Sequence, residues 1–308
     1  MEYEVIDGKG IIPDGVTEIG KEAFAGCTNL QSIVIPYSVK VIEEGAFESC
    51  TSLKSIIIPN SVTEIERWAF CICTSLQSIE IPDSVTVIGK EAFRNCTSLQ
   101  SIELPNSVME IGESTFRGCT SLQSIELPNS VIKIGSSAFN RCASLKSIVI
   151  PDSVAKIDNW AFSGCDNLTS IIVSKNNSKY KSINNCILTK DGKELILCGN
   201  HEIPDGVTKI GVWAFCNCTS LQSISIPDSV TTIEGIAFYN CISLQSITIA
   251  TQEKKPDMSR EKIEYLLQEL SEYSKEISLR VPIGCGYAYR HYPAFKGKFQ
   301  KIIADIDV

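Results

Sequence analysis

Apolar and polar positions along the chain repeat every 23 residues. Prolines mark this period at positions 13, 36, 59, 82, 105, 128 and 151, and the series resumes at 204 and 227. A phenylalanine follows each of these prolines eleven residues later, at Phe24, Phe47, Phe70, Phe93, Phe116, Phe139, Phe162, Phe215 and Phe238. One short unit cannot bury its own apolar face. The periodicity therefore predicts a stack of similar coils in which each unit covers the next.

Each unit contains the same predicted local elements. In Leu99-Gln-Ser-Ile-Glu-Leu104 the apolar residues lie three and two positions apart, which predicts a short strand. Pro105 ends this strand, because proline has no amide proton to donate to a β-ladder. A second short apolar pair comes after the turn, Val85 and Ile88 in one copy. The segment 91–96 has room for only a turn or two of helix.

The full repeat reads Ile-Pro-x-Ser-Val-x-x-Ile-x-x-x-Ala-Phe-x-x-Cys-x-x-Leu-x-x-Ile and extends over residues 12–250. This pattern resembles the BspA-like leucine-rich repeat family, which is known mainly from bacterial surface proteins and some parasitic protists. The resemblance implies an α/β solenoid, a right-handed superhelix with parallel strands on its concave face. It also implies adhesion or protein binding without catalysis. We therefore predict a leucine-rich repeat solenoid over residues 1–250.

Two segments depart from the repeat. Residues 174–203 hold an insert in which Asp191-Gly192, placed between apolar runs, predicts a β-hairpin. After residue 250 the period stops, and the segment 251–308 is predicted to be a C-terminal cap that contains a helix. The helix is indicated by Ile263, Leu266, Leu267 and Leu270 at helical spacing, and a further strand is predicted at 277–281.

Cysteine recurs once per repeat, at Cys27, Cys50, Cys73, Cys96, Cys119, Cys142, Cys165, Cys218 and Cys241. Such a column has three interpretations. The cysteines could bind metal, form a ladder of disulfides, or act as small apolar side chains that fill one hole in each coil. Zinc sites use closely spaced cysteine pairs, and parallel side chains in one column suit disulfides poorly. We therefore expect packing. Cys186, Cys198 and Cys285 lie outside the pattern and have no predicted role.

One outward-facing strand position varies between repeats, and it carries the predicted partner-binding site. The column contains Val34, Ile57, Glu80, Glu103, Glu126, Val149, Ile172, Ser225 and Thr248. Three glutamates at sheet pitch place like charges side by side, which is unfavourable unless they are screened or paired. The predicted site residues are Glu80, Glu103, Glu126, Ile57 and Val149, which would dock a basic partner segment or a cation. The alternative is a solvated acidic strip without a partner.

Three further columns are candidates for function. Serine occupies the position two residues before the glutamate column in all nine repeats, but no acid, base or histidine recurs beside it, so we expect it to be structural. Gln77, Gln100 and Gln123 adjoin it and could supply polar contacts. Trp68, Trp160 and Trp213 share one position before Ala-Phe, where packing on the convex side and an aromatic ligand strip are both conceivable.

Composition narrows the classes of function. The formal charge of −8 and the isoelectric point near 5.0 disfavour nucleic acid and anionic membranes as partners. No apolar run is long enough for a membrane span, and the first ten residues do not read as a signal peptide. We expect no cofactor and no metal. The expected partner is a protein, for example a basic segment, or a surface glycan, and the sequence does not indicate the oligomeric state.

Two other functions stay open. The chain could be a structural spacer within a larger surface protein, or an enzyme that uses Cys285, His291 and Tyr287 in the C-terminal segment. The second is disfavoured, because a cysteine near a histidine in sequence is weak evidence for a nucleophilic pair. Localisation is also open: the residues alone favour a cytoplasmic protein with reduced thiols, whereas the resemblance suggests the cell surface.

Overall fold

The computed structural model describes residues 3–199, 201–249, 278–282 and 301–306. It divides into two compact units, Met1–Lys179 and Tyr180–Val308, which are called unit 1 and unit 2 below. The predicted helix around residues 263–270, and the residues Cys285, Tyr287 and His291, lie outside the described part of the chain. The predicted boundary between solenoid and cap at residue 250 stays a prediction.

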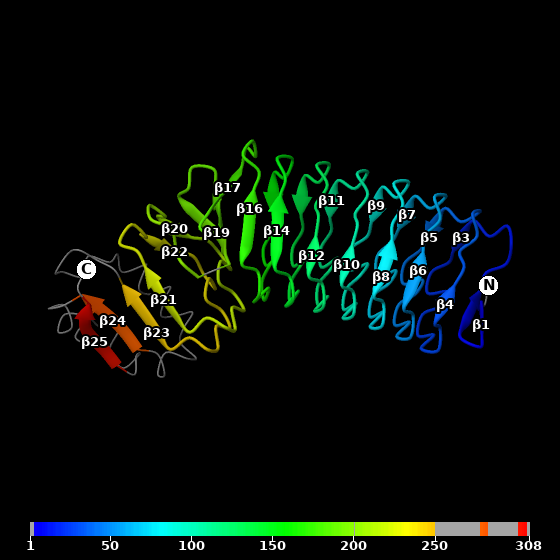
Figure 1. The fold of residues 1–308 in the computed structure, drawn as a ribbon, viewed down its shortest axis with the longest axis horizontal. Helices are drawn as coiled ribbons and strands as arrows, with labels where there is room; N and C mark the ends of the chain where they lie inside the picture. The colour runs from blue at the N-terminus through cyan, green and yellow to red at the C-terminus, as the bar shows by residue number, and fades with distance from the viewer. Residues whose placement is uncertain (1–2, 200, 250–277, 283–300, 307–308) are drawn as a thin grey trace. The chain divides into compact units, whose positions relative to one another are not determined.

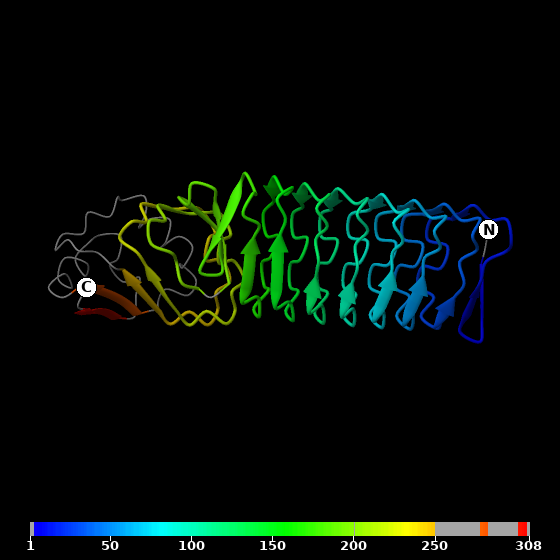
Figure 2. The same ribbon diagram turned by 45° about the horizontal axis from the view of Figure 1, so that its top comes forward.

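In unit 1 every coil contributes one short strand to each of two parallel ladders (Figure 1). The first ladder, here called the strand face, contains β4 (Ser32–Ile33), β6 (Ser55–Ile57), β8 (Ser78–Glu80), β10 (Ser101–Ile102), β12 (Ser124–Ile125), β14 (Ser147–Ile150) and β16 (Ser170–Val173). The second contains β3 (Glu18–Ile19), β5 (Val41–Ile42), β7 (Glu64–Ile65), β9 (Val87–Ile88), β11 (Glu110–Ile111), β13 (Lys133–Ile134) and β15 (Lys156–Ile157). Figure 2 shows the same rows of strands from another side.

Register follows the sequence period. Ser101 pairs with Ser124, and Glu110 pairs with Lys133, each 23 residues further along the chain. A hairpin of β1 (Glu4–Ile6) and β2 (Lys9–Ile11) begins unit 1, and β2 pairs in parallel with β4. The predicted parallel strands, one per repeat, are confirmed.

The expected turn or two of helix in each unit is wrong, because the described residues form no helix there. Glu91 and Asn95 have φ angles of 57° and 58°, in the left-handed region, and the equivalent residues of the other coils do the same. Between them the N–H of Phe93 donates to the carbonyl oxygen of Thr115 in the next coil, at 3.0 Å. Amides that bond to the next coil are not available for a helical bond within their own coil. The segment is therefore a pair of turns.

The core of unit 1 is a row of stacked phenylalanine rings. From Phe24 to Phe162 successive ring centroids lie 5.3–5.6 Å apart, with the ring planes within 9° of parallel. Phe116, for example, is fully buried. Aligned leucine and isoleucine columns complete the interior, so burial at one sequence position recurs in every coil.

Unit 2 begins with the predicted hairpin. The strands β17 (Tyr180–Ile183), β18 (Cys186–Thr189) and β19 (Glu194–Cys198) are antiparallel, and Asp191-Gly192 lies in the connection between β18 and β19. β19 then pairs in parallel with β20 (Lys209–Ile210), which pairs with β22 (Thr232–Ile233). A second sheet has the order β21 (Ser223–Ile226), β23 (Ser246–Ile249), β24 (Ser278–Pro282) and β25 (Lys301–Ile306). β24 confirms the strand expected at 277–281.

Candidate functional site

The strand face of unit 1 exposes the side chains that flank one buried residue in each strand. In β8 the central Ile79 is buried, whereas Ser78 and Glu80 point to solvent. The alternation follows from the pleat of a strand, which sends successive side chains to opposite sides. Each outward position of the repeat thus becomes a line of side chains at a pitch of about 4.8 Å.

The five predicted partner-binding residues lie in five consecutive coils. Ile57 is the Cα partner of Glu80, and Glu80 forms a parallel bridge with Glu103. The pairing of Ile102 with Ile125 brings Glu126 next to Glu103, and the pairing of Ser124 with Ser147 brings Val149 into the following coil. The structure therefore assembles Ile57, Glu80, Glu103, Glu126 and Val149 into one line, which is called the acidic strip below.

The glutamates of the acidic strip differ from the other acids of unit 1 in their surroundings. No ion pair within 4 Å joins Glu80, Glu103 or Glu126 to a cation among the described residues. On the second ladder, by contrast, Lys133 Nζ lies 2.6 Å from a Glu110 oxygen, and this hydrogen bond raises the pKa of the lysine. Glu110 thus has a lysine of the next coil as its neighbour on the second ladder, whereas the three glutamates of the strand face have only each other and apolar side chains as strand neighbours. The strip is thus open to a basic group from outside.

Apolar side chains border the acidic strip at both ends. Ile57 is 71% exposed, and Val34, in the coil before it, is 82% exposed. At the other end Val149 pairs with Ile172, and both are about half exposed. Large exposed apolar side chains that gather on one face are unusual for a free surface and are typical of binding sites. The predicted arrangement of three acids between apolar shoulders is present.

The columns next to the glutamates on the strand face consist of small or polar side chains. Gln77, Gln100 and Gln123 are exposed beside the glutamates, and so are the serines that follow them, Ser78, Ser101 and Ser124. The tryptophans lie elsewhere, at the left-handed turn position: Trp68 and Trp160 have φ angles of 62° and 57°. The guanidinium of Arg67 stacks over the Trp68 ring at 3.8 Å. Trp68 and Trp160 therefore belong to the turns and not to the strand face.

The repeated cysteines fill the interior as expected. The thiol of Cys119 donates to the carbonyl oxygen of Phe93, 3.1 Å away, and six other cysteines of the column make the equivalent contact at the same distance. Burial raises the pKa of Cys119 to about 12, which keeps the thiol protonated and unreactive near neutral pH. None of these column cysteines is in a disulfide, and no group of three potential metal ligands occurs in the described part of the chain.

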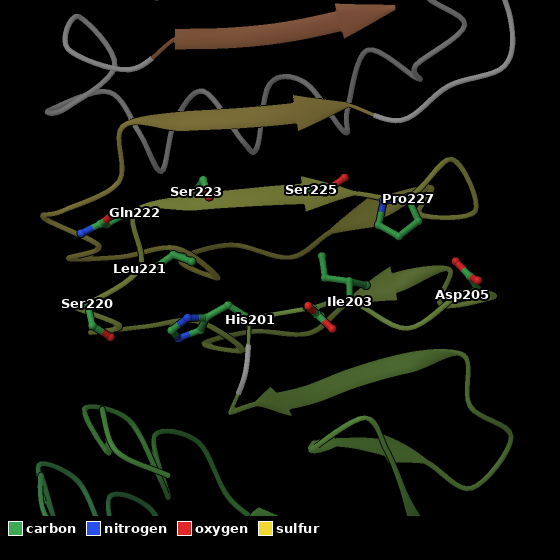
Figure 3. Close-up of a pocket in the computed structure, with 10 residues that line it drawn as sticks. His201, Ile203, Asp205, Ser220, Leu221, Gln222, Ser223, Ser225 and Pro227 are labelled. Carbon is green, nitrogen blue, oxygen red and sulfur yellow. The ribbon is translucent and has the colours of Figure 1, made fainter. Parts of the chain in front are cut away.

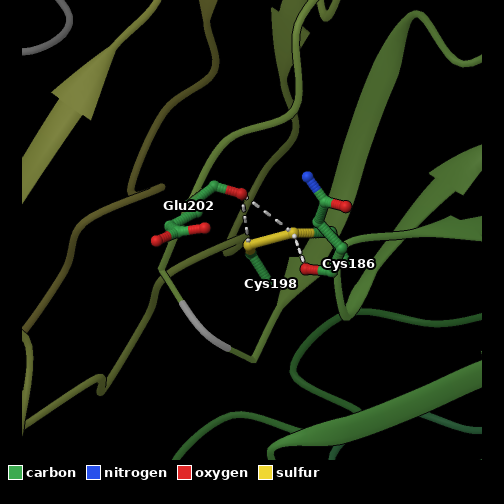
Figure 4. The surroundings of a disulfide bond; sticks show 4 residues. Cys186, Cys198 and Glu202 are labelled. Atoms are coloured by element: carbon green, nitrogen blue, oxygen red, sulfur yellow. Dashed lines mark hydrogen bonds between the residues drawn. A yellow bond between two sulfur atoms is a disulfide. The ribbon is translucent and has the colours of Figure 1, made fainter.

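Sequence reasoning missed a disulfide in the insert. Cys186 and Cys198 are Cα partners on β18 and β19, and their sulfur atoms are bonded (Figure 4). Both Sγ atoms lie 3.3 Å from the carbonyl oxygen of Glu202. Counting outward from the Asp191-Gly192 turn places these two cysteines almost opposite each other, so the sequence did contain the signal.

A cavity of about 590 Å³ in unit 2 was also not predicted from the sequence (Figure 3). Its lining comes from two segments, which supply His201, Glu202, Ile203 and Asp205 on one side, and Ser220, Leu221, Gln222, Ser223, Ser225 and Pro227 on the other. No repeat position predicts this cavity, because it lies where the regular succession of coils is interrupted. Its size falls within the usual range for ligand sites.

Comparison with known proteins identifies the repeat. The BspA type leucine rich repeat region, in six copies, matches residues 9–106, 86–190 and 197–259. The chain belongs to the BspA-type leucine-rich repeat family. Up to residue 259 the matches leave out only residues 1–8 and 191–196, so they cover both ladders and most of the insert.

Two solved structures of leucine-rich repeat proteins are similar to most of this chain. A leucine-rich cell surface protein from Faecalibacterium prausnitzii is 29% identical with a TM-score of 0.68, covering 95% of this chain and 84% of that protein. A leucine-rich repeat protein from Bacteroides ovatus is 29% identical with a TM-score of 0.59, covering 88% of this chain and 68% of that one. The pneumococcal vaccine antigen PcpA, at 16% identity and a TM-score of 0.51, shares the fold. A comparison with curated proteins finds no match.

These comparisons establish a parallel-strand solenoid of the leucine-rich repeat type. BspA-type relatives are repeat proteins of the kind that serves as interaction modules. Within the described residues no helix has the length and hydrophobicity needed to cross a membrane.

Proposed function

We propose that this chain is a non-catalytic interaction module whose acidic strip binds a basic, extended segment of a partner protein. The observation that carries the proposal is the line of Glu80, Glu103 and Glu126, without a cation in ion-pair range among the described residues, between exposed apolar shoulders. The similarity to a cell surface protein of Faecalibacterium prausnitzii supports a location at the cell surface, where the module would act in adhesion.

The dimensions of the strip suit a short peptide. From Ile57 to Val149 there are four steps of about 4.8 Å, or roughly 19 Å, which an extended segment of about six residues spans. Basic side chains two residues apart in that segment point to the same side and lie about 7 Å from each other. Such a pair covers the three glutamates, and apolar residues at the ends of the segment reach the shoulders.

The test is a triple variant, Glu80→Gln, Glu103→Gln and Glu126→Gln, titrated calorimetrically with a peptide that carries two lysines between isoleucines. Exposed charge pairs contribute about 0.2–1 kcal/mol each, so loss of all three should reduce the affinity roughly 3- to 150-fold. The loss should shrink at high salt, because salt screens exposed charges.

The matched control neutralises three other exposed acids of unit 1, with Glu4→Gln, Glu18→Gln and Glu64→Gln. It changes the net charge equally but leaves the strip intact, so it should bind like the parent chain. Equal losses in both triple variants would show that only net charge matters and would overturn the site. Binding of a neutral glycan that ignores both the variants and the salt would favour the glycan alternative.

A further inference from the structure

The cavity in unit 2 lies beside β21, at the place where the repeat pattern leads one to expect a further strand from the preceding coil. Counting back from Pro204 as in every other repeat, Glu202 occupies the position of Glu80 and Glu103, and Ile203 that of the buried residue before proline. The segment does not form a strand, however, and His201 has a left-handed φ of 62°. β21 consequently stands at one end of its sheet, whose order is β21-β23-β24-β25.

The outer edge of β21 carries backbone groups that a neighbouring strand would use. The Ser246 amide of β23 donates to the Gln222 carbonyl at 3.3 Å, so residue 222 faces β23. Because backbone groups alternate along a strand, the N–H and C=O groups of Ser223 and Ser225 face the opposite edge.

At equivalent positions this edge is paired. The amide of Ser32 donates to Gly8, and that of Ser170 donates to Lys146, each at 3.1 Å. No such bond joins the outer edge of Ser223 or Ser225 to any residue that the structure describes. Unpaired strand edges are natural templates for an added strand.

The side chains around the outer edge of β21 determine which kind of ligand fits there. The exposed residues Glu202 and Asp205 line the cavity, and no lysine or arginine occurs among the described residues of its lining. Ile203 and Leu221 are buried and give the cavity an apolar floor. In Figure 3 the segment with His201, Ile203 and Asp205 lies across the cavity from Gln222, Ser223 and Ser225.

We propose that this edge is a peptide-binding site. An extended peptide adds to β21 as a further strand, its backbone bonds to Ser223 and Ser225, and a lysine or arginine side chain of the peptide lies near Glu202 and Asp205. Main-chain bonds give affinity in this mode of recognition, and side-chain pockets give specificity. The site belongs to unit 2 alone and does not depend on the acidic strip of unit 1.

The test uses a short peptide of alternating valine and threonine with a central arginine, and two derivatives of it. One derivative is N-methylated at its odd residues and the other at its even residues, so each loses the amide protons of one edge. Strand addition uses one edge of the peptide. We expect one derivative to bind like the parent peptide and the other to bind at least tenfold more weakly. Equal binding of the two derivatives would overturn the proposal, as would a failure of the unmethylated peptide to bind.

Variants of the protein locate the site. Ser225→Pro removes an edge amide that has no internal partner among the described residues, and it should weaken peptide binding about tenfold without loss of the folded state. Glu202→Gln with Asp205→Asn should weaken the arginine peptide and leave an uncharged analogue unaffected. The control pair Glu18→Gln and Glu64→Gln should have no effect. The triple variant of the acidic strip should also bind this peptide normally, which separates failure here from failure of the proposed function.

Discussion

The stacked phenylalanines make a measurable prediction about how the coils of unit 1 stabilise one another. Phe116 is fully buried, with ring centroids 5.6 Å from Phe93 and 5.5 Å from Phe139. Each stacked pair contributes about 0.5–1.5 kcal/mol beyond the burial of its area. Phe116→Leu keeps most of the volume but loses both ring contacts, so we expect a loss of roughly 1–3 kcal/mol in the free energy of unfolding. Phe116→Ala also leaves a cavity and should cost about 3–5 kcal/mol.

A pair of double-mutant cycles isolates the ring contact from simple loss of volume. The first cycle combines Phe93→Leu with Phe116→Leu, whose rings touch, and should give a coupling energy of about 0.5–1.5 kcal/mol. The second combines Phe93→Leu with Phe139→Leu, whose rings are separated by Phe116. These two changes should be additive within about 0.5 kcal/mol.

The assay is urea unfolding followed by far-ultraviolet circular dichroism, with the dependence of the free energy on urea concentration compared across all variants. An unchanged dependence shows that the variants unfold the same structure. Equal coupling in the two cycles, or no coupling in the first, would refute the idea that neighbouring rings stabilise each other by direct stacking.

Two further predictions concern the turns and the cysteines. Ile72 has a left-handed φ of 61°, which is unfavourable for a β-branched residue, and the same column holds asparagine at positions 95, 217 and 240. Ile72→Asn should therefore stabilise the chain by about 0.5–1 kcal/mol and the reverse change, Asn95→Ile, should destabilise it; urea unfolding measures both, and a loss in Ile72→Asn would contradict the reasoning. Burial raises the pKa of the Cys50, Cys119 and Cys165 thiols to about 12, above the value near 9 of an exposed thiol. Stability from these protonated thiols is complete below pH 9 and is lost as the pH rises towards 12, with a slope of up to about 1.4 kcal/mol per pH unit for each thiol. Cys119→Ala should reduce the pH dependence of the free energy of unfolding by the contribution of one thiol, as measured in unfolding curves recorded at increasing pH. An unchanged slope would show that this thiol does not titrate with unfolding.

Where each candidate residue lies in the acidic strip was predictable, because a fixed period converts sequence distance into spatial order. Glu80, Glu103 and Glu126 had to be neighbours once their coils stacked in register, and alternation along the strand had to expose them. The left-handed turns were signalled only weakly, by glycine at position 45 and asparagine at position 95 among unrelated residues such as Trp68. The helix expected there failed because bonds between coils satisfy the amides that a helix would use.

The sequence by itself determined the repeat, the parallel strands of the strand face, the buried columns and the composition of that face, since all of these depend only on residues at equal spacing meeting in successive coils. Only the tertiary structure decided what happens where the period breaks. It paired Cys186 with Cys198, left β21 at a sheet end and opened a cavity beside Glu202. These features depend on how the chain leaves and rejoins the stack. Local spacing does not encode that path, because the contacts that set it join segments outside the repeat.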